Sequence, residues 1–233
     1  MDLQNREKFL TKLAERMGRP LQTVPEPMPE LVNDHAVTRL TDLSQEQLCK
    51  EFIDFARVMM TDVVEVKEAD LPTAIIEICE KYGGGNIIVN NDERLKTLGI
   101  TGAVQAKYEN CHQWDFNLGE ENLEKAKQAN IGIVYGEYGL TESGGIVLFS
   151  SKDYGRSVSL LPEKSVVVLR KSTVLPRVAQ LAKILHDKAQ QGERMPSCVN
   201  IISGPSATAD IELIKVVGVH GPVNKIYLVI DDL

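Results

Sequence analysis

The sequence predicts an α/β fold in which a mostly parallel sheet carries helices on both faces, preceded by an N-terminal helical arm. Short apolar runs of strand length alternate with longer helical segments from about Leu40 to the C-terminus, as in parallel sheets. The 233 residues are 43% hydrophobic and 25% charged, which suits a globular domain with a sizeable core. A proline-rich stretch, Val24–Pro29, separates this pattern from the first helix.

The N-terminal arm is predicted from residues 2–18, where apolar side chains recur at helical spacing and Gly18 ends the pattern. Pro25, Pro27 and Pro29 exclude helix and central strand, so the segment after the helix is a semi-rigid linker. We therefore expect a helix and proline-rich arm over residues 1–36 and the α/β domain over residues 37–233. The helix is expected to pack on the main domain or on a partner subunit.

The elements of the main domain follow in order. Ser44 and Gln47 form a capping box that begins a helix reaching Met60. Three glycines, residues 83–85, precede a strand rather than follow one, which favours a helix end over a phosphate loop. Further helices are expected over residues 71–83, from Asp92, and over residues 120–130 and 172–191. Strands are expected over residues 63–66, 86–90, 131–135, 144–150, 165–169, 198–202 and 225–230, with 144–150 and 165–169 as neighbours.

Composition excludes several classes of function. A net charge of -7 and only 5% aromatic residues argue against a nucleic-acid-binding surface. There is no apolar run of about 18 residues and no signal peptide, so we expect a cytoplasmic protein without a membrane span. Its four cysteines, Cys49, Cys79, Cys111 and Cys198, are too scattered for an iron–sulfur or zinc site, and no Gly-x-Gly-x-x-Gly loop follows a strand. We expect no metal and no cofactor.

One candidate site is the turn Glu142-Ser143-Gly144 between two predicted strands. Its carboxylate can act as a base, a nucleophile or a ligand anchor, and Gly144 lets a substrate approach the backbone. The alternative is a strand bend in which Glu142 is merely solvated.

A second candidate is the segment 203–212, which follows a strand and is expected to open a helical turn. Its free amides, with the side chains of Ser206, Thr208 and Asp210, suit a phosphate or carboxylate, although simple helix capping explains the same residues. His220 is a candidate acid or base, and Arg156 a candidate clamp for an anion. A lone loop histidine is more often structural, and a surface ion pair explains Arg156 equally well, so both alternatives stay open. We predict that Glu142, Ser143, Ser206, Thr208 and Asp210 line one pocket, with Arg156 and His220 as further members.

These segments together resemble the LUD (lactate utilization) domain family. The resemblance rests on residues 141–144, 155–156, 159–162, 203–212 and 218–222, and the last two blocks are its most specific part. The N-terminal helix and proline arm match the C branch of the family. The resemblance implies a fold related to sugar-phosphate isomerases and CoA transferases.

It also implies a role in oxidising L-lactate to pyruvate together with two iron–sulfur sister proteins. This chain lacks their cysteine motifs, so whether it is itself an enzyme stays open. One hypothesis is a non-catalytic subunit of a lactate-oxidising complex, and a homodimer is compatible with it. Another is a stand-alone CoA-transferase-like enzyme or binding module for a small anion, because Glu142-Ser143-Gly144 has the Glu-x-Gly form of those transferases. A third is a regulatory sensor of lactate or a nucleotide.

Overall fold

The computed structural model describes residues 2–24, 26–27, 29–209 and 214–233. The chain divides into two compact units, residues 1–34 and 35–233, which are described separately. In the first unit, helix α1 (Leu3–Arg16) begins at Asp2, whose carboxylate accepts a hydrogen bond from the amide of Gln4. Leu3 and Phe9 on this helix are exposed. No helix in the described part of the chain is long and apolar enough to cross a membrane.

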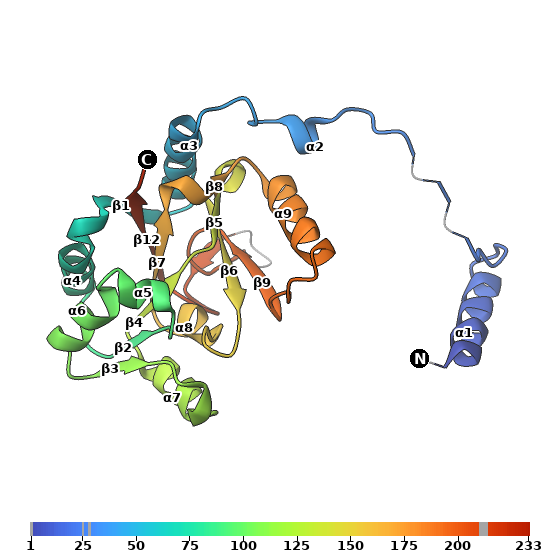
Figure 1. Cartoon of the computed structure of the whole chain (residues 1–233). Helices are drawn as coiled ribbons and strands as arrows, with labels where there is room; N and C mark the ends of the chain where they lie inside the picture. Colours follow the sequence, from blue (N-terminus) through green and yellow to red (C-terminus); the bar gives the residue numbers. More distant parts are fainter. Residues whose placement is uncertain (1, 25, 28, 210–213) are drawn as a thin grey trace. The chain divides into compact units, whose positions relative to one another are not determined.

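A six-stranded sheet forms the centre of the second unit, and every neighbouring pair in it is parallel. This confirms the predicted fold class. The first strand lies at one edge of the sheet, and the last strand of the chain is inserted beside it, between the first and the seventh (Figure 1). In spatial order the strands are β1 (Thr61–Lys67), β12 (Asn224–Asp231), β7 (Lys164–Arg170), β4 (Ile131–Tyr135), β2 (Ile87–Val89) and β3 (Cys111–Gln113).

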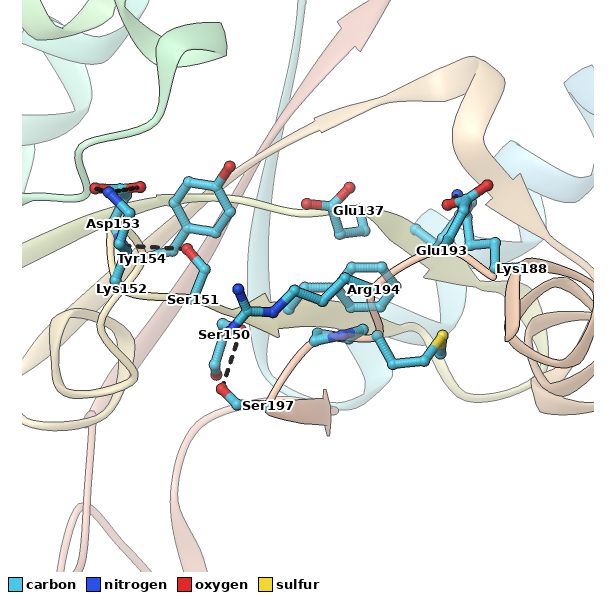
Figure 2. Close-up of a pocket in the computed structure, with 14 residues that line it drawn as sticks. Glu137, Ser150, Ser151, Lys152, Asp153, Tyr154, Lys188, Glu193, Arg194 and Ser197 are labelled. Carbon is cyan, nitrogen blue, oxygen red and sulfur yellow. Dashed lines mark hydrogen bonds and ion pairs between the residues drawn. The ribbon is translucent and has the colours of Figure 1, made fainter. Parts of the chain in front are cut away.

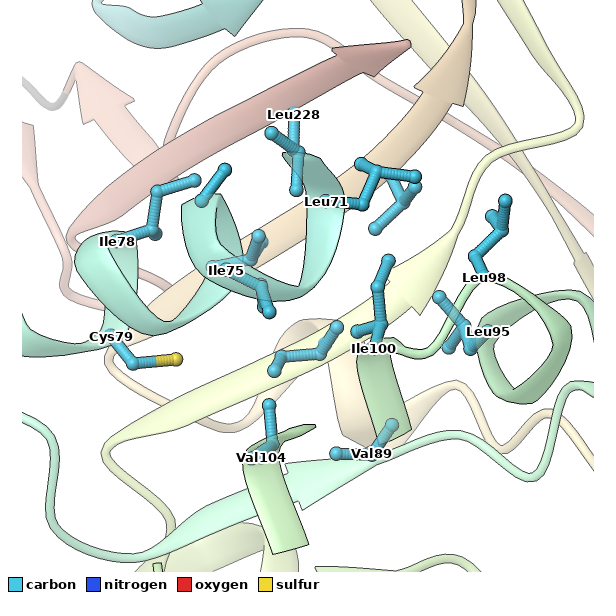
Figure 3. Packing of buried hydrophobic residues seen from close by; sticks show 14 of the residues in the cluster. Leu71, Ile75, Ile78, Cys79, Val89, Leu95, Leu98, Ile100, Val104 and Leu228 are labelled. Atoms are coloured by element: carbon cyan, nitrogen blue, oxygen red, sulfur yellow. The ribbon is translucent and has the colours of Figure 1, made fainter. Parts of the chain in front are cut away.

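Helices cover both faces of this sheet, because successive residues of the central strands are apolar on either side. The first face packs against α4 (Leu71–Lys81), α5 (Glu93–Thr97) and α6 (Ile100–Lys107), as Figure 3 shows for Ile75, Leu95 and Ile100. The second face packs against α3 (Gln45–Val58), α7 (Glu121–Gln128) and α8 (Ser157–Leu160). The capping box of Ser44 and Gln47 is present. Gly83 and Gly84, both with positive φ, end α4 as expected.

A second sheet has four strands in the order β8 (Val174–Leu175), β5 (Tyr138–Leu140), β6 (Gly145–Ser150) and β9 (Cys198–Ile202). The expectation that 144–150 and 165–169 are neighbours was wrong. The turn at 141–143 returns the chain antiparallel to β5, which takes β6 out of the parallel sheet. The long helix expected from Ser172 begins later, as α9 (Val178–Gln190), because residues 174–175 pair with β5 ahead of Pro176.

The remaining elements are small. Residues 207–209 and 215–217 form an antiparallel pair, β10 (Ala207–Ala209) and β11 (Lys215–Val217). The described part of the 203–212 segment is therefore a loop followed by a strand, and the expected helical turn is absent from it. Strand pairing between Thr208 and Val216 satisfies the backbone there. Short helical segments complete the fold: α2 (His35–Thr38), η1 (Glu68–Asp70), η2 (Phe116–Leu118), η3 (Thr141–Ser143) and η4 (Lys171–Thr173).

Candidate functional site

Glu142 lies in the turn η3, and its carboxylate binds the start of helix α9. One carboxylate oxygen accepts a hydrogen bond from the Val178 amide at 2.8 Å, and the other accepts one from Nε of Arg177 at 2.6 Å. A carboxylate at a helix N-terminus satisfies a free amide and complements the helix dipole. In this arrangement Glu142 joins the second sheet to α9.

Ser143 and Gly144 hold neighbouring segments together through their backbone. The Ser203 hydroxyl donates to the Ser143 carbonyl at 2.6 Å, and the Tyr227 hydroxyl donates to the Gly144 carbonyl at 3.1 Å. Gly144 has φ +57°, and a Cβ atom there would collide with the backbone of Ala56 in α3. Glycine is required here by close packing.

Ser206 and His220 do meet, in a pocket that we call the amino-end pocket because it lies at the amino ends of β12 and β7. Its volume is about 200 Å³, smaller than the ~300–1,000 Å³ typical of sites for larger ligands. Ser206 is half-buried, whereas His220 is exposed and stands at the mouth. The lining residues are Ser159, Leu160, Ile202–Ser206, His220–Pro222 and Lys225.

Lys225 is the residue of this pocket that the sequence interpretation missed. It is the second residue of β12, is 2% exposed, and points to the same face of the sheet as Tyr227 and Val229. Its Nζ donates to the Ser165 hydroxyl at 2.9 Å, and burial lowers the pKa of Lys225 to about 7. A lysine beginning an otherwise apolar strand was the signal in the sequence that could have identified it.

The other predicted site residues lie elsewhere. Thr208 is in the β10–β11 pair and does not line the amino-end pocket. Arg156 is exposed in an adjoining groove that shares Leu160 with that pocket. Glu142 lines neither space, and Asp210 lies outside the described residues.

A larger space, about 680 Å³, lies beyond the carboxyl end of β4, and we call it the carboxyl-end cleft. Figure 2 shows Arg194 extending across it towards Ser150 and Ser151, with Glu137 and Tyr154 on the opposite side. The carboxyl ends of parallel strands are the usual location of ligand sites in α/β folds.

The charges around Arg94, beside this cleft, are mutually compensated, whereas the exposed Arg194 in its lining has no ion pair among the described residues. The Arg94 guanidinium lies 2.6 Å from Glu137 and 2.7 Å from Asp92, and it stacks 4.1 Å from the ring of Tyr135. Burial opposes the charge of Arg94, but the hydrogen bonds from Glu137 and Asp92 outweigh it and raise the pKa of Arg94 above its usual range. Arg94 therefore holds two carboxylates in place, and four of its five side-chain N–H donors are already used.

The cysteines do not form a cluster. Cys49 and Cys79 are buried, and desolvation raises the pKa of the Cys49 thiol to about 11 and that of Cys79 to about 12. Within the described ranges no three His, Cys, Asp or Glu side chains are arranged to hold a metal ion.

Comparison with known proteins gives consistent matches. The LUD domain family matches residues 49–230. The chain is 54% identical to "Uncharacterized protein YkgG" of Escherichia coli, over 99% of this chain and all of that one. It is 42% identical to "Lactate utilization protein C" of Halalkalibacterium halodurans, over 99% of both chains, and 37% identical to the protein of that name from Bacillus subtilis, over 99% of this chain and 98% of the other.

A crystal structure of a DUF162 family protein from Deinococcus radiodurans has the same fold. It superposes with a TM-score of 0.58 at 20% identity, covering 81% of this chain and 99% of the other.

Proposed function

This chain belongs to the LUD domain family, and we propose that it is a cytoplasmic subunit of a bacterial lactate utilization system. In this proposal it works with iron–sulfur sister proteins that oxidise L-lactate to pyruvate. The observation that carries the proposal is the full-length match, at 36–42% identity, to relatives named lactate utilization protein C. Because the match includes residues outside the family domain, it supports a shared role as well as a shared fold.

The cysteine environment supports a division of labour. Electron transfer through iron–sulfur clusters needs several closely spaced thiolates. Cys49 and Cys79 are buried thiols whose raised pKa disfavours the thiolate form. We therefore assign electron transfer to the sister proteins and ligand binding or assembly to this chain.

The contacts of Glu142 weigh against the alternative of a CoA-transferase-like nucleophile. Its two oxygens are engaged by Arg177 and by the Val178 amide, so an attack would first break both contacts. We propose that a ligand binds instead in the amino-end pocket, where Ser206 and His220 lie beside Lys225.

Growth on L-lactate tests the proposed function. A strain lacking this chain should fail to grow on L-lactate as sole carbon source yet grow normally on pyruvate, because the defect precedes pyruvate. Lactate-dependent dye reduction in its extract should return when the purified chain is added. Normal growth of the deletion strain on L-lactate would contradict the proposal.

Copurification provides the second test. A tagged chain isolated under anaerobic conditions should bring with it proteins that carry stoichiometric iron and acid-labile sulfide. A tagged variant lacking residues 1–30 is the matched sample for deciding whether the arm makes this contact.

A further inference from the structure

Lys225 occupies an unusual place for a basic side chain. Its strand lies inside the parallel sheet, between β1 and β7, and the residues that follow it on the same face, Tyr227 and Val229, are buried in the apolar core. A lysine can usually extend its ammonium group to water, but Lys225 is 2% exposed. Its amine instead faces the amino-end pocket.

The hydrogen-bond capacity of this amine is mostly unused. An ammonium group has three donors, and among the described residues Nζ of Lys225 has one acceptor, the Ser165 hydroxyl at 2.9 Å. No ion pair joins Lys225 to a carboxylate of the described residues. A buried charge without a partner is costly, so burial at this position favours the neutral amine.

Other titratable groups near Lys225 are compensated or stand apart. The charged and titratable residues on the surrounding elements are Asp62, Arg156, Glu163, Lys164, His220 and Tyr227. Glu163 and Lys164 pair with each other at 2.6 Å, and Asp62 pairs with Lys81 at 3.3 Å. Burial raises the pKa of Tyr227 beyond the range in which it would ionise. Among the described residues, His220 is therefore the titratable group that shares the pocket with Lys225.

The rim of the pocket is built before a ligand arrives. The Ser206 amide donates to the Pro222 carbonyl at 2.9 Å, and the Gly218 amide donates to the Ser206 carbonyl at 2.8 Å. A Cβ atom at Gly221 would lie only 3.1 Å from that of Ser206, so the two loops pack tightly. These contacts fix the backbone of the two loops that carry Ser206 and His220 at the edge of the pocket that Lys225 lines.

From this arrangement we propose that the amino-end pocket binds a small monocarboxylate. The carboxylate of this ligand pairs with Lys225, and His220 and Ser206 contact a second oxygen atom of the ligand. A volume of about 200 Å³ equals the share of about seven waters in the liquid, which suits an acid of three or four carbons. That the acid is a 2-hydroxy or 2-oxo acid rests on the proposed function. The monocarboxylate class rests on the pocket alone.

The number of protons taken up on binding can be measured and tests this inference. The neutral amine, one proton from solvent and the carboxylate anion combine to form an ammonium–carboxylate pair, and no covalent bond changes. Binding therefore takes up one proton wherever Lys225 is neutral in the empty pocket. By linkage, the observed association constant should fall about tenfold for each pH unit within that range.

Calorimetric titration of the full-length protein tests this. Acetate, L-lactate, pyruvate and inorganic phosphate are titrated at pH 7 to 9.5, in chloride-free HEPES and Tris buffers with different enthalpies of ionisation. We expect L-lactate or pyruvate to bind with uptake of about one proton at pH 8.5 and the stated pH slope. Binding without proton uptake, binding of phosphate alone, or no binding of any probe would each overturn the inference.

Two variants locate the group responsible. In Lys225→Met the buried chain length is kept and the charge removed, so carboxylate affinity should fall roughly 10- to 100-fold or more. In His220→Gln the affinity should fall less and proton uptake should persist, because His220 is exposed at the mouth. If Lys225→Met binds as tightly as the wild type, or if His220→Gln abolishes proton uptake, Lys225 is not the anchor. Proton uptake by the wild-type chain decides the question even if a variant fails to fold.

Failure of this inference and failure of the proposed function are separable. Full growth on L-lactate by a strain carrying Lys225→Met would contradict the inference and leave the system assignment standing. Growth without the chain would contradict the assignment but not the measured binding of a monocarboxylate.

Discussion

The two ends of the six-stranded sheet each hold a cation, and they do so in opposite ways. Beyond the carboxyl end, Arg94 is bound by Glu137 and Asp92 within 2.7 Å and lies over Tyr135. At the amino end, Lys225 is more deeply buried and has a single hydroxyl partner. The first arrangement stabilises the fold, because each charge has its partner. The second lowers the stability of the fold, and in our proposal a bound anion offsets that loss.

This difference shows why pocket size does not identify the site. The carboxyl-end cleft is larger and lies where α/β folds usually bind ligands. However, Arg94 beside it is already neutralised, as are the lining lysines in the Lys188–Glu193 and Lys152–Asp153 pairs. Arg194 has no ion pair among the described residues, but it is exposed to solvent, so its charge is not buried. The amino-end pocket is smaller, but the buried amine of Lys225 in it has only a hydroxyl partner and can pair with an anion.

Removing Arg94 should have the largest effect on stability. Arg94→Met leaves Glu137 and the nearly buried Asp92 without their cation, so we expect a loss of about 2–4 kcal/mol, at the lower part of the range for buried pairs because Arg94 is 38% exposed. Urea denaturation measures it. Lys96→Met, which breaks the exposed Lys96–Glu93 pair, is the control and should cost under about 1 kcal/mol. Equal losses in both variants would remove the contrast between paired and surface charges.

Removing Lys225 should have the opposite sign. With a folded-state pKa of about 7, Lys225 binds fewer protons in the folded chain than in the unfolded chain between pH 7 and about 10.5. Its cost to stability is therefore full below pH 7 and disappears as the pH rises through that window. We expect Lys225→Met to be about 1–3 kcal/mol more stable than the wild type at pH 6, because the apolar replacement is partly offset by the lost Ser165 contact.

The measurement is urea denaturation of both proteins from pH 6 to pH 10, without added carboxylates. The advantage of Lys225→Met should shrink steadily towards pH 10. A constant difference across this range would show that Lys225 does not titrate in the folded protein, and that the two ends of the sheet differ less than we infer.

Replacing Glu142 should have an intermediate effect on stability. Glu142→Gln should lower the free energy of unfolding by about 1 kcal/mol, because it weakens the cap on α9 and the contact with Arg177. The side chains of Glu142 and Arg177 are 23% and 21% exposed. Lactate-dependent growth should be retained. Lys183→Gln, which removes an exposed pair within α9, is the matched control. Loss of growth at an unchanged melting temperature would instead restore Glu142 as a catalytic residue.

The smallest effect on stability is expected from the N-terminal arm. The amino-end pocket and the carboxyl-end cleft draw all their lining residues from positions 137–225. Deleting residues 1–30 should therefore shift the melting temperature by about one degree or less and leave carboxylate binding unchanged. Weaker copurification of the iron–sulfur proteins would identify the arm as a subunit contact, whereas collapse of the thermal transition would place the domain boundary elsewhere.

The sequence by itself determined the parallel sheet and most of its helices. Apolar runs such as Val166–Leu169 leave no polar face for solvent, and local signals such as the Ser44 capping box or the glycines after α4 act over only a few residues. These features depend on near neighbours in the chain. For that reason they could be predicted without knowing the packing.

Only the tertiary structure decided how the candidate site is assembled. Ser206 and His220 line one pocket with Lys225 because β12 is inserted between β1 and β7, and this strand order is set by contacts between segments far apart in the chain. Glu142 joined Arg177, and Thr208 joined a strand pair, for the same reason. A side chain's type is written in the sequence, but its solvation and its partners depend on long-range packing, and these decide whether it binds a ligand or stabilises the fold.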